Sequence, residues 1–262
     1  MINESDPKLI RHIMENVLPP KGTVLYKFRT IKGSGLEKIL RNHTLWFGSP
    51  LTWNDPFDGQ IRPVAGYTEG NFASWLKKSA PGMPKDRVDI LVQHNRENPG
   101  KWEVLRDEAL TDGMRGVGMC CFSNTWDPML QWSYYADGHT GVALGFHRDL
   151  DLKLFGMAHR VEYVEDYPEI NYFTEAARVI EAVLHVKSDV WSHEREVRIW
   201  NNPPGLKKYD PEALREIIFG VRCDPRQIAK IQKWCRSSGL AHVEFYQAEL
   251  APRSFEVTRK RI

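Results

Sequence analysis

Three charged side chains near residue 196 have a spacing that could support catalysis. The segment WSHEREVRIW reads as a β-strand, and alternation along a strand places Glu194, Glu196 and Arg198 on one face. Neighbours on one strand face are about 7 Å apart, so two carboxylates would project side by side with a guanidinium next in line. Flanking Trp191 and Trp200 favour a cleft over an ordinary solvated surface, where such charges pair across strands. A carboxylate in a cleft could transfer protons or stabilise a developing positive charge.

A second aromatic-rich segment, residues 121–141, connects an apolar strand to a helix. Ser123 lies at the end of the expected strand, and the expected helix carries Trp132, Tyr134 and Tyr135. Trp132 shares a helical face with apolar residues, a pattern that is more typical of a core position than of a cofactor contact. His139 follows this helix and could serve as a metal ligand or a base, although a lone loop histidine more often does neither.

The familiar nucleotide-binding and hydrolase motifs do not occur in the sequence. The Rossmann fingerprint, the P-loop, HExxH, GxSxG and the kinase motifs are all absent. Oxygen and imidazole groups are present at Asp137, His139, His193 and either Glu194 or Glu196, but without a recognisable ligand spacing. A metal-dependent nuclease or hydrolase therefore stays open as an alternative, and no residue is assigned as a metal ligand.

The composition is that of an ordinary globular protein. Of its 262 residues, 42% are hydrophobic and 27% charged, and 36 basic against 34 acidic side chains give a formal charge of +2. This balance excludes collagen-like and largely disordered chains, and it does not by itself predict a nucleic-acid or membrane partner. The polar N-terminus and the lack of a long apolar run predict a cytoplasmic protein without a membrane partner. A basic C-terminus and the pair Lys207 and Lys208 keep a non-catalytic nucleic-acid or protein-binding module open as a further alternative.

The four cysteines predict a reduced protein. Cys120, Cys121, Cys223 and Cys235 form no CxxC pair, and two of them lie in the apolar run GVGMCCF. We therefore expect buried free thiols in place of disulfides or a zinc site.

The order of expected elements is typical of an α+β protein. Strands at 23–28, 117–122 and 194–200 are expected to line one cleft, and helices are expected at 35–41 and 225–237. No regular βαβ period is visible, so we predict a split, mostly antiparallel sheet with flanking helices. The expected organisation is a helical lead-in at 1–22, a single α+β domain at 23–250 with a helical insertion at 66–115, and a basic C-terminal tail at 251–262.

The turn-rich run FGSPLTWNDPFDG is expected to form an ordered loop. Asx residues next to proline favour turns in which the side chain bonds to its own backbone. We therefore expect Asn54 and Asp58 to make such bonds while Trp53 and Phe57 pack beneath the cleft.

Five segments in a fixed order resemble a known bacterial family. They are LYKF, LWFGSPLTWNDPFDG, CFSNTWDPMLQWSYYADGHTGVALGF, WSHEREVRIW and EIIFGVRC. Their order and spacing resemble the bacterial domain of unknown function 2971 family over about residues 24–235. That architecture in turn resembles the ADP-ribosyltransferase fold: a first strand with a polar residue next to Tyr, a following helix, a middle strand ending in Ser, and a late strand with E-x-E.

The resemblance implies an activity and a set of site residues. It implies an NAD-dependent ADP-ribosyltransferase of toxin or phage-defence type, with NAD as a substrate and a macromolecular acceptor that is a nucleic acid or a protein. Tyr26 and Lys27 fall where such enzymes grip the cofactor with a first-strand His or Arg. Ser123 falls at the middle-strand serine, and Glu196 falls at the catalytic carboxylate. The sequence departs from the pattern at Lys27 and in having one serine where a fuller Ser-Thr-Ser run is usual.

The chemistry of the implied reaction gives roles to the remaining candidates. Cleavage of the nicotinamide glycosidic bond passes through an oxocarbenium-like state that the Glu196 carboxylate could stabilise, while Glu194 would orient or activate the acceptor. The leaving ring would stack on an aromatic side chain, and the pyrophosphate would meet a cation. The aromatic candidates are Trp132, Tyr134 and Tyr135, and the cationic candidates are Arg198, Arg29 and Lys27.

Overall fold

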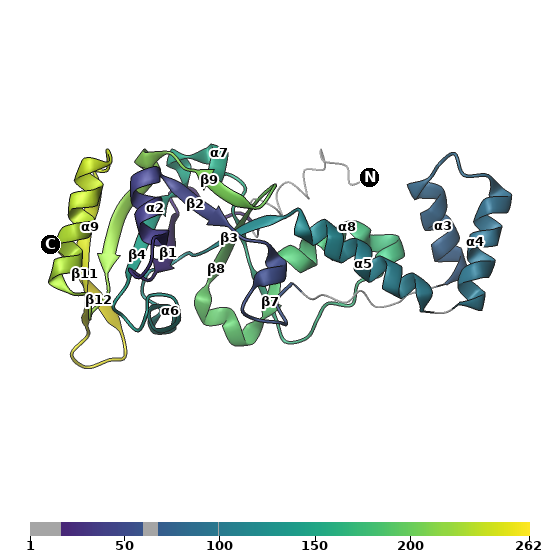
Figure 1. Cartoon of the computed structure of the whole chain (residues 1–262). Helices are drawn as coiled ribbons and strands as arrows, with labels where there is room; N and C mark the ends of the chain where they lie inside the picture. Colours follow the sequence, from purple (N-terminus) through teal and green to yellow (C-terminus); the bar gives the residue numbers. More distant parts are fainter. Residues whose placement is uncertain (1–16, 60–67, 99) are drawn as a thin grey trace. The chain divides into compact units, whose positions relative to one another are not determined.

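The computed structural model describes residues 17–59, 68–98 and 100–262 (Figure 1). The chain divides into two compact units: unit 1 comprises Met1–Gly48, Gly118–Val161 and Val190–Ile262, and unit 2 comprises Ser49–Val117 and Glu162–Asp189. The stretch 23–250, expected to form one domain, is thus shared between two units. The helix expected within 1–22 lies outside the described residues, which begin at 17.

Unit 1 is built on one large sheet. Its strands are β1 (Val24–Arg29), β3 (Gly118–Ser123), β4 (Val142–His147), β5 (His159–Arg160), β8 (Glu196–Asn201), β10 (Leu214–Phe219), β11 (Glu244–Leu250) and β12 (Val257–Arg261). They lie in the order β12-β11-β10-β4-β1-β3-β8-β5, and every neighbouring pair is antiparallel except β10 and β11. In unit 1, β2 (Thr44–Phe47) and β9 (Gly205–Lys208) pair separately. The predicted α+β class with a large, mostly antiparallel sheet is confirmed, and among the described residues this eight-stranded sheet is continuous, not split.

Each face of the sheet packs against a buried hydrophobic cluster. Alternate side chains along a strand point to opposite sides, so the strands contribute to both clusters. On one side, Leu25 belongs to a core that includes side chains of α2 (Gly35–Asn42) and α9 (Pro225–Ser237). On the other side, Phe28 belongs to a core that includes side chains of α6 (Met129–Tyr134). We call these two sides the α9 face and the α6 face.

The helix α9 begins and ends where the sequence predicts. The side chain of Asp224 caps it by accepting a hydrogen bond from Arg226 N at 2.7 Å, and Pro225 occupies the first turn, where its missing N–H does no harm. Gly239 follows with a φ of 75°, a conformation that ends helices readily. The helix connects β10 to β11, which are parallel and therefore need a long crossover between them (Figure 1).

Unit 2 is mainly helical. Its elements are η2 (Pro50–Thr52), α3 (Glu69–Ser79), α4 (Lys85–Glu97), α5 (Lys101–Arg115), β6 (Glu162–Val164), α8 (Tyr172–His185) and β7 (Val186–Ser188). Three of its helices fall within 66–115, the stretch expected to form a helical insertion. Phe72, Val88 and Phe173 join α3, α4 and α8 in one buried cluster, so this unit is assembled from two separated stretches of chain.

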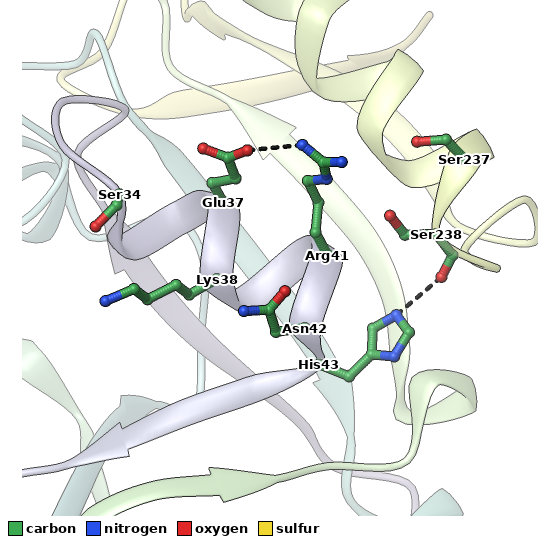
Figure 2. Close-up of a pocket in the computed structure, with 8 residues that line it drawn as sticks. All are labelled: Ser34, Glu37, Lys38, Arg41, Asn42, His43, Ser237 and Ser238. Atoms are coloured by element: carbon green, nitrogen blue, oxygen red, sulfur yellow. Dashed lines mark hydrogen bonds and ion pairs between the residues drawn. The ribbon is translucent and has the colours of Figure 1, made fainter.

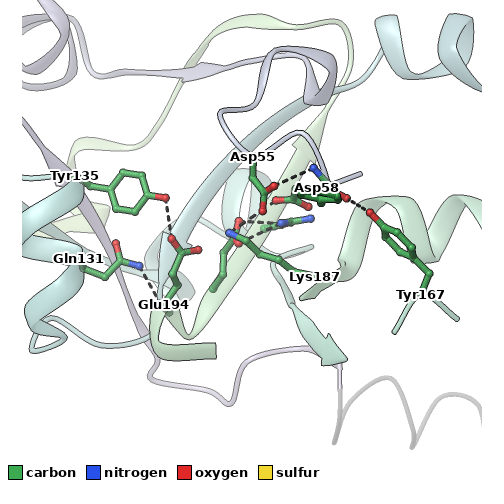
Figure 3. Close-up of polar contacts among 10 residues, drawn as sticks. Asp55, Asp58, Gln131, Tyr135, Tyr167, Lys187 and Glu194 are labelled. Atoms are coloured by element: carbon green, nitrogen blue, oxygen red, sulfur yellow. Dashed lines mark hydrogen bonds and ion pairs between the residues drawn. The ribbon is translucent and has the colours of Figure 1, made fainter. Parts of the chain in front are cut away.

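The loop that follows β2 turns at Asp55. The Oδ1 atom of Asp55 accepts a hydrogen bond from Phe57 N at 2.9 Å, and Tyr167 OH donates to Phe57 O at 2.7 Å (Figure 3). The Phe57 side chain is 69% exposed, so the expected packing of this ring beneath a cleft is wrong. Asp58 is buried with a carboxylate oxygen 3.8 Å from Lys187 Nζ, a partner too far along the chain for local sequence to indicate.

The segment 251–262, expected as a basic tail, contains a strand of the sheet. β12 pairs antiparallel with β11, from Tyr246 opposite Arg261 to Leu250 opposite Val257. Charged residues suit an edge strand, because they discourage pairing with other chains. The basic residues led us to expect a tail at a position where the chain forms β12.

Candidate active site

Tyr26, Ser123 and Glu196 lie in one row across three adjacent strands. Tyr26 on β1 is paired with Ser123 on β3, and Ser123 is paired with Glu196 on β8. Directly paired residues in antiparallel strands point to the same face, and neighbouring strands lie about 4.8 Å apart. The structure therefore brings these three residues together on the α6 face.

The carboxylate of Glu196 is held at two points by Arg198. The Nε and Nη2 atoms of Arg198 donate to the two carboxylate oxygens at 2.9 and 3.2 Å. The exposed fraction is 6% for Glu196 and 0% for Arg198, so two buried opposite charges compensate each other. Such a forked contact fixes the orientation of the carboxylate.

Two further groups next to this ion pair were not expected from the sequence. β3 places Cys121 opposite Arg198, and β5 places His159 opposite Arg198 on the other side. Burial and then the Glu196 carboxylate raise the pKa of Cys121, while burial lowers the pKa of His159. A neutral thiol and a neutral imidazole therefore flank the ion pair at neutral pH. No local motif marks either residue, because both reach the site through strand pairing.

Glu194 does not share the strand face of Glu196, and the predicted strand at 194–200 starts too early. Glu194 ends η4 (Asp189–Glu194), and Arg195 has a φ of 45°, a left-handed conformation that interrupts strand alternation before β8 begins. Tyr135 OH donates to Glu194 Oε1 at 2.8 Å, and Gln131 Nε2 donates to the main-chain oxygen of Glu194 at 3.3 Å (Figure 3). Tyr135, the residue that follows α6, thus orients the side chain of Glu194, and Gln131 of α6 holds its main chain.

Tyr26 is fixed by a carboxylate from β10. Its hydroxyl donates to Glu216 Oε1 at 2.6 Å, and Arg259 Nη1 donates to the same oxygen at 2.7 Å. The Arg259 guanidinium lies 4.9 Å from the ring centre of Trp126 and 4.5 Å from that of Tyr246. Burial, followed by the Glu216 hydrogen bond, raises the pKa of Tyr26, so the phenol remains a neutral donor. This network could not be expected from the sequence, because its members come from strands far apart in the chain.

Lys27 points away from the row. Alternation along β1 turns it, together with Arg29, to the α9 face, opposite to Tyr26. Its Nζ donates to Cys121 O at 2.7 Å and lies 5.0 Å from the ring centre of Phe122. Burial lowers the pKa of Lys27. Tyr26 and Lys27, both expected where the cofactor is gripped, therefore project to opposite faces of the sheet.

The three aromatic candidates have different surroundings. Trp132 is fully buried, with its ring 5.1 Å from that of Phe28 in an edge-on contact and its Nε1 donating to Trp126 O at 2.8 Å. The hydroxyl of Tyr135 donates a hydrogen bond to the Glu194 carboxylate. Tyr134 is 61% exposed and is the one of the three whose ring is open to solvent. Trp132 is therefore a core residue, as its helical face suggested.

A pocket of about 580 Å³ lies between α2 and the end of α9, away from Glu196 (Figure 2). It is lined by polar side chains, including Lys38, Arg41 and His43. Since α2 and α9 cover the α9 face, this pocket is on the opposite side of the sheet from the row of Tyr26 and Ser123.

The structure gives no sign of a metal centre or a membrane span in the parts that it describes. Among residues 17–59, 68–98 and 100–262, no three His, Cys, Asp or Glu side chains are grouped closely enough to hold a metal ion. None of the helices in these ranges is long and apolar enough to cross a membrane.

The cysteines are free thiols, and two more of them besides Cys121 have raised pKa values. All four are free; Cys120, Cys223 and Cys235 are buried, whereas Cys121 is partly covered. Burial raises the pKa of Cys223 to about 11 and that of Cys235 to about 12. Only the thiolate reacts with disulfide reagents, so both should be almost unreactive in the folded protein.

We expect a disulfide reagent at about pH 8 to label Cys223 and Cys235 at least about 100-fold more slowly in the native protein than in denaturant. Labelling followed over time by peptide mass spectrometry measures each cysteine separately, and the denatured protein is the control. Fast native labelling of Cys235 would contradict its burial.

Comparison with known proteins gives one match. A family model described as a protein of unknown function (DUF2971) matches residues 131–199. No curated protein and no solved structure matches the chain. The matched stretch supports the family resemblance and contains Glu194, Glu196 and Arg198, whereas Tyr26 and Ser123 lie outside it.

Proposed function

We propose that this protein is an NAD-dependent ADP-ribosyltransferase of toxin or phage-defence type that modifies a macromolecular acceptor. The observation that carries the proposal is the row of Tyr26, Ser123 and Glu196 on adjacent strands. The resemblance assigns these residues to a first, a middle and a late strand, and nothing in their sequence spacing requires such strands to be neighbours.

The chemistry of the proposed reaction needs a fixed negative charge beside the ribose. As the nicotinamide bond breaks, positive charge develops on the sugar, and a preoriented carboxylate stabilises it. The forked contact with Arg198 would hold the Glu196 carboxylate in place before the substrate arrives. The hydroxyl of Ser123, paired with Glu196 across the sheet, would position the nicotinamide ribose.

The geometry narrows the roles of the other candidates. Tyr134 is the proposed stacking residue for the leaving ring, because Trp132 is buried in the core. Lys27 has no role at the proposed site, since it faces the other side of the sheet. Glu194 keeps its proposed role toward the acceptor, with Tyr135 as its positioning residue.

The proposal also requires movement around the row. The exposed fractions of Tyr26, Ser123 and Glu196 are 7%, 2% and 6%, so NAD can reach them only if covering segments open. One such segment follows Ser123, where Thr125 N donates to Ser123 Oγ at 3.3 Å. Conformational steps of this kind commonly limit turnover.

The test is release of nicotinamide from NAD by the full chain, followed by incubation with labelled NAD and a whole-cell extract. We expect nicotinamide release and a labelled product; digestion of that product with nuclease or protease then identifies the class of acceptor. The absence of both NAD turnover and NAD binding would overturn the proposal.

A further inference from the structure

One side of α9 carries only basic charges. Arg226, Lys230 and Lys233 recur at intervals of four and three residues, which places them on one side of the helix. All three are exposed, and so is Arg236 near the helix end. The helix itself contains no acidic residue, and in the described part of the chain no acidic side chain pairs with the first three. We call Arg226, Lys230 and Lys233 the basic stripe.

Positive charge is concentrated on this side of the protein. Together, α2 and α9 carry six basic side chains and one acidic side chain, Glu37. With 36 basic and 34 acidic side chains in the whole chain, the remaining residues have a net charge of −3. The nearly neutral overall charge therefore conceals a local field that would attract a polyanion.

The basic stripe leads to the pocket between α2 and α9. Ser237 comes four residues after Lys233, continues the same side of the helix and lines the pocket. Lys38 and Arg41 line it from α2, and Arg41 pairs with Glu37 at 2.8 Å (Figure 2). At about 580 Å³ the pocket is within the usual size range of ligand sites. Its lining also includes the Glu37 carboxylate, whose charge Arg41 compensates, and the remaining cation, imidazole, hydroxyls and amide suit a phosphorylated sugar.

We propose that α2 and α9 bind the phosphodiester backbone of a nucleic acid, with phosphates along the basic stripe and one nucleotide unit in the pocket. Lys and Arg neutralise phosphates without reading the sequence, so the binding is sequence-independent and sensitive to salt. An anionic membrane is a poorer match, because a membrane-bound helix needs large apolar side chains beside its basic ones. Here Ile231 and Cys235 are buried in the core, and the partly buried Ile228 and Trp234 pack against it.

This inference is independent of the proposed enzymatic function. The stripe and the pocket lie on the α9 face, whereas the row with Glu196 lies on the α6 face. Failure of nucleic-acid binding therefore leaves the assay of nicotinamide release intact, and the reverse also holds.

The test uses the full chain and fluorescence anisotropy with labelled duplex DNA, duplex RNA and single strands. For wild type we expect the logarithm of the binding constant to fall linearly with the logarithm of salt concentration between about 50 and about 200 mM. We expect a triple variant to have a less negative slope on duplex DNA, by about three, and to bind at least about 30-fold more weakly at about 100 mM salt. Its substitutions are Arg226→Gln, Lys230→Gln and Lys233→Gln.

The matched control variant removes three positive charges from unit 2, as many as the first variant removes from the basic stripe. Lys77→Gln, Lys78→Gln, Lys85→Gln changes three exposed lysines and should leave binding and slope as in wild type. Ser237→Asp, which places a negative charge at the pocket, should weaken binding with the stripe intact and serves as a second test if the triple variant folds poorly. The proposal is overturned if wild type binds no nucleic acid at low salt, if both triple variants behave alike, or if only anionic vesicles are bound.

Discussion

Nicotinamide release from NAD should fall at least about 100-fold in the Glu196→Gln variant. Gln preserves the shape of the side chain and removes the charge that would stabilise the oxocarbenium-like state. Initial rates under saturating NAD measure the effect on the chemical step, and a separate binding assay shows whether NAD affinity is retained.

The same substitution also affects folding, because it removes the carboxylate that pairs with the buried Arg198. Breaking one partner of a buried ion pair costs about 3 to 5 kcal/mol, so circular dichroism must show that the variant is folded at the assay temperature. Glu216→Gln is a comparison for stability only, since Glu216 is likewise buried and paired with an arginine, Arg259, but also holds Tyr26 of the proposed site. The two unfolding curves compare the losses of stability, and nicotinamide release by folded Glu196→Gln measures the loss of chemistry.

Glu194→Gln provides the comparison within the site. Its proposed role is on the acceptor side, so it should slow transfer to the acceptor more than hydrolysis of NAD. Equal nicotinamide release by wild type and Glu196→Gln would refute the role of Glu196.

The direction of side chains could be predicted from strand alternation where the chain forms a regular strand. Alternation correctly placed Glu196 and Arg198 on one face of β8, because residues two apart on a strand share a side. It failed one step earlier, at Glu194, since the non-glycine residue Arg195 takes a left-handed conformation that no sequence pattern indicates. The expected alternation therefore holds only from Glu196 onward, where β8 begins, because Glu194 belongs to η4.

Contacts between segments that are distant in the chain could not be predicted from the sequence. Glu216 and Arg259 fix Tyr26, and His159 lies opposite Arg198, through the pairing of strands that are far apart in sequence. Local signals did define α9, where a capping Asp224 and a first-turn proline are encoded within a few residues. Helices and caps are local, whereas the order of strands in a sheet is decided by the packing of the whole unit.

Trp132→Ala should lower the free energy of unfolding by about 3 to 5 kcal/mol. The Trp132 side chain is fully buried, packs edge-on against Phe28 at 5.1 Å and donates to Trp126 O at 2.8 Å, so truncation leaves a cavity and an acceptor without this donor. Urea unfolding followed by circular dichroism measures the loss.

Tyr134→Ala, two residues further along the same helix, is the matched control for this core assignment. Its ring is 61% exposed, so its removal should change the free energy of unfolding by no more than about 0.5 to 1 kcal/mol. The same pair of variants distinguishes structure from substrate contact, because an aromatic that stacks on the nicotinamide ring contributes to NAD affinity and not to folding. We therefore expect Tyr134→Ala to weaken NAD binding in a stable protein and Trp132→Ala to destabilise the protein. A Trp132→Ala variant of unchanged stability with reduced NAD affinity would instead make Trp132 a substrate contact and contradict its place in the core.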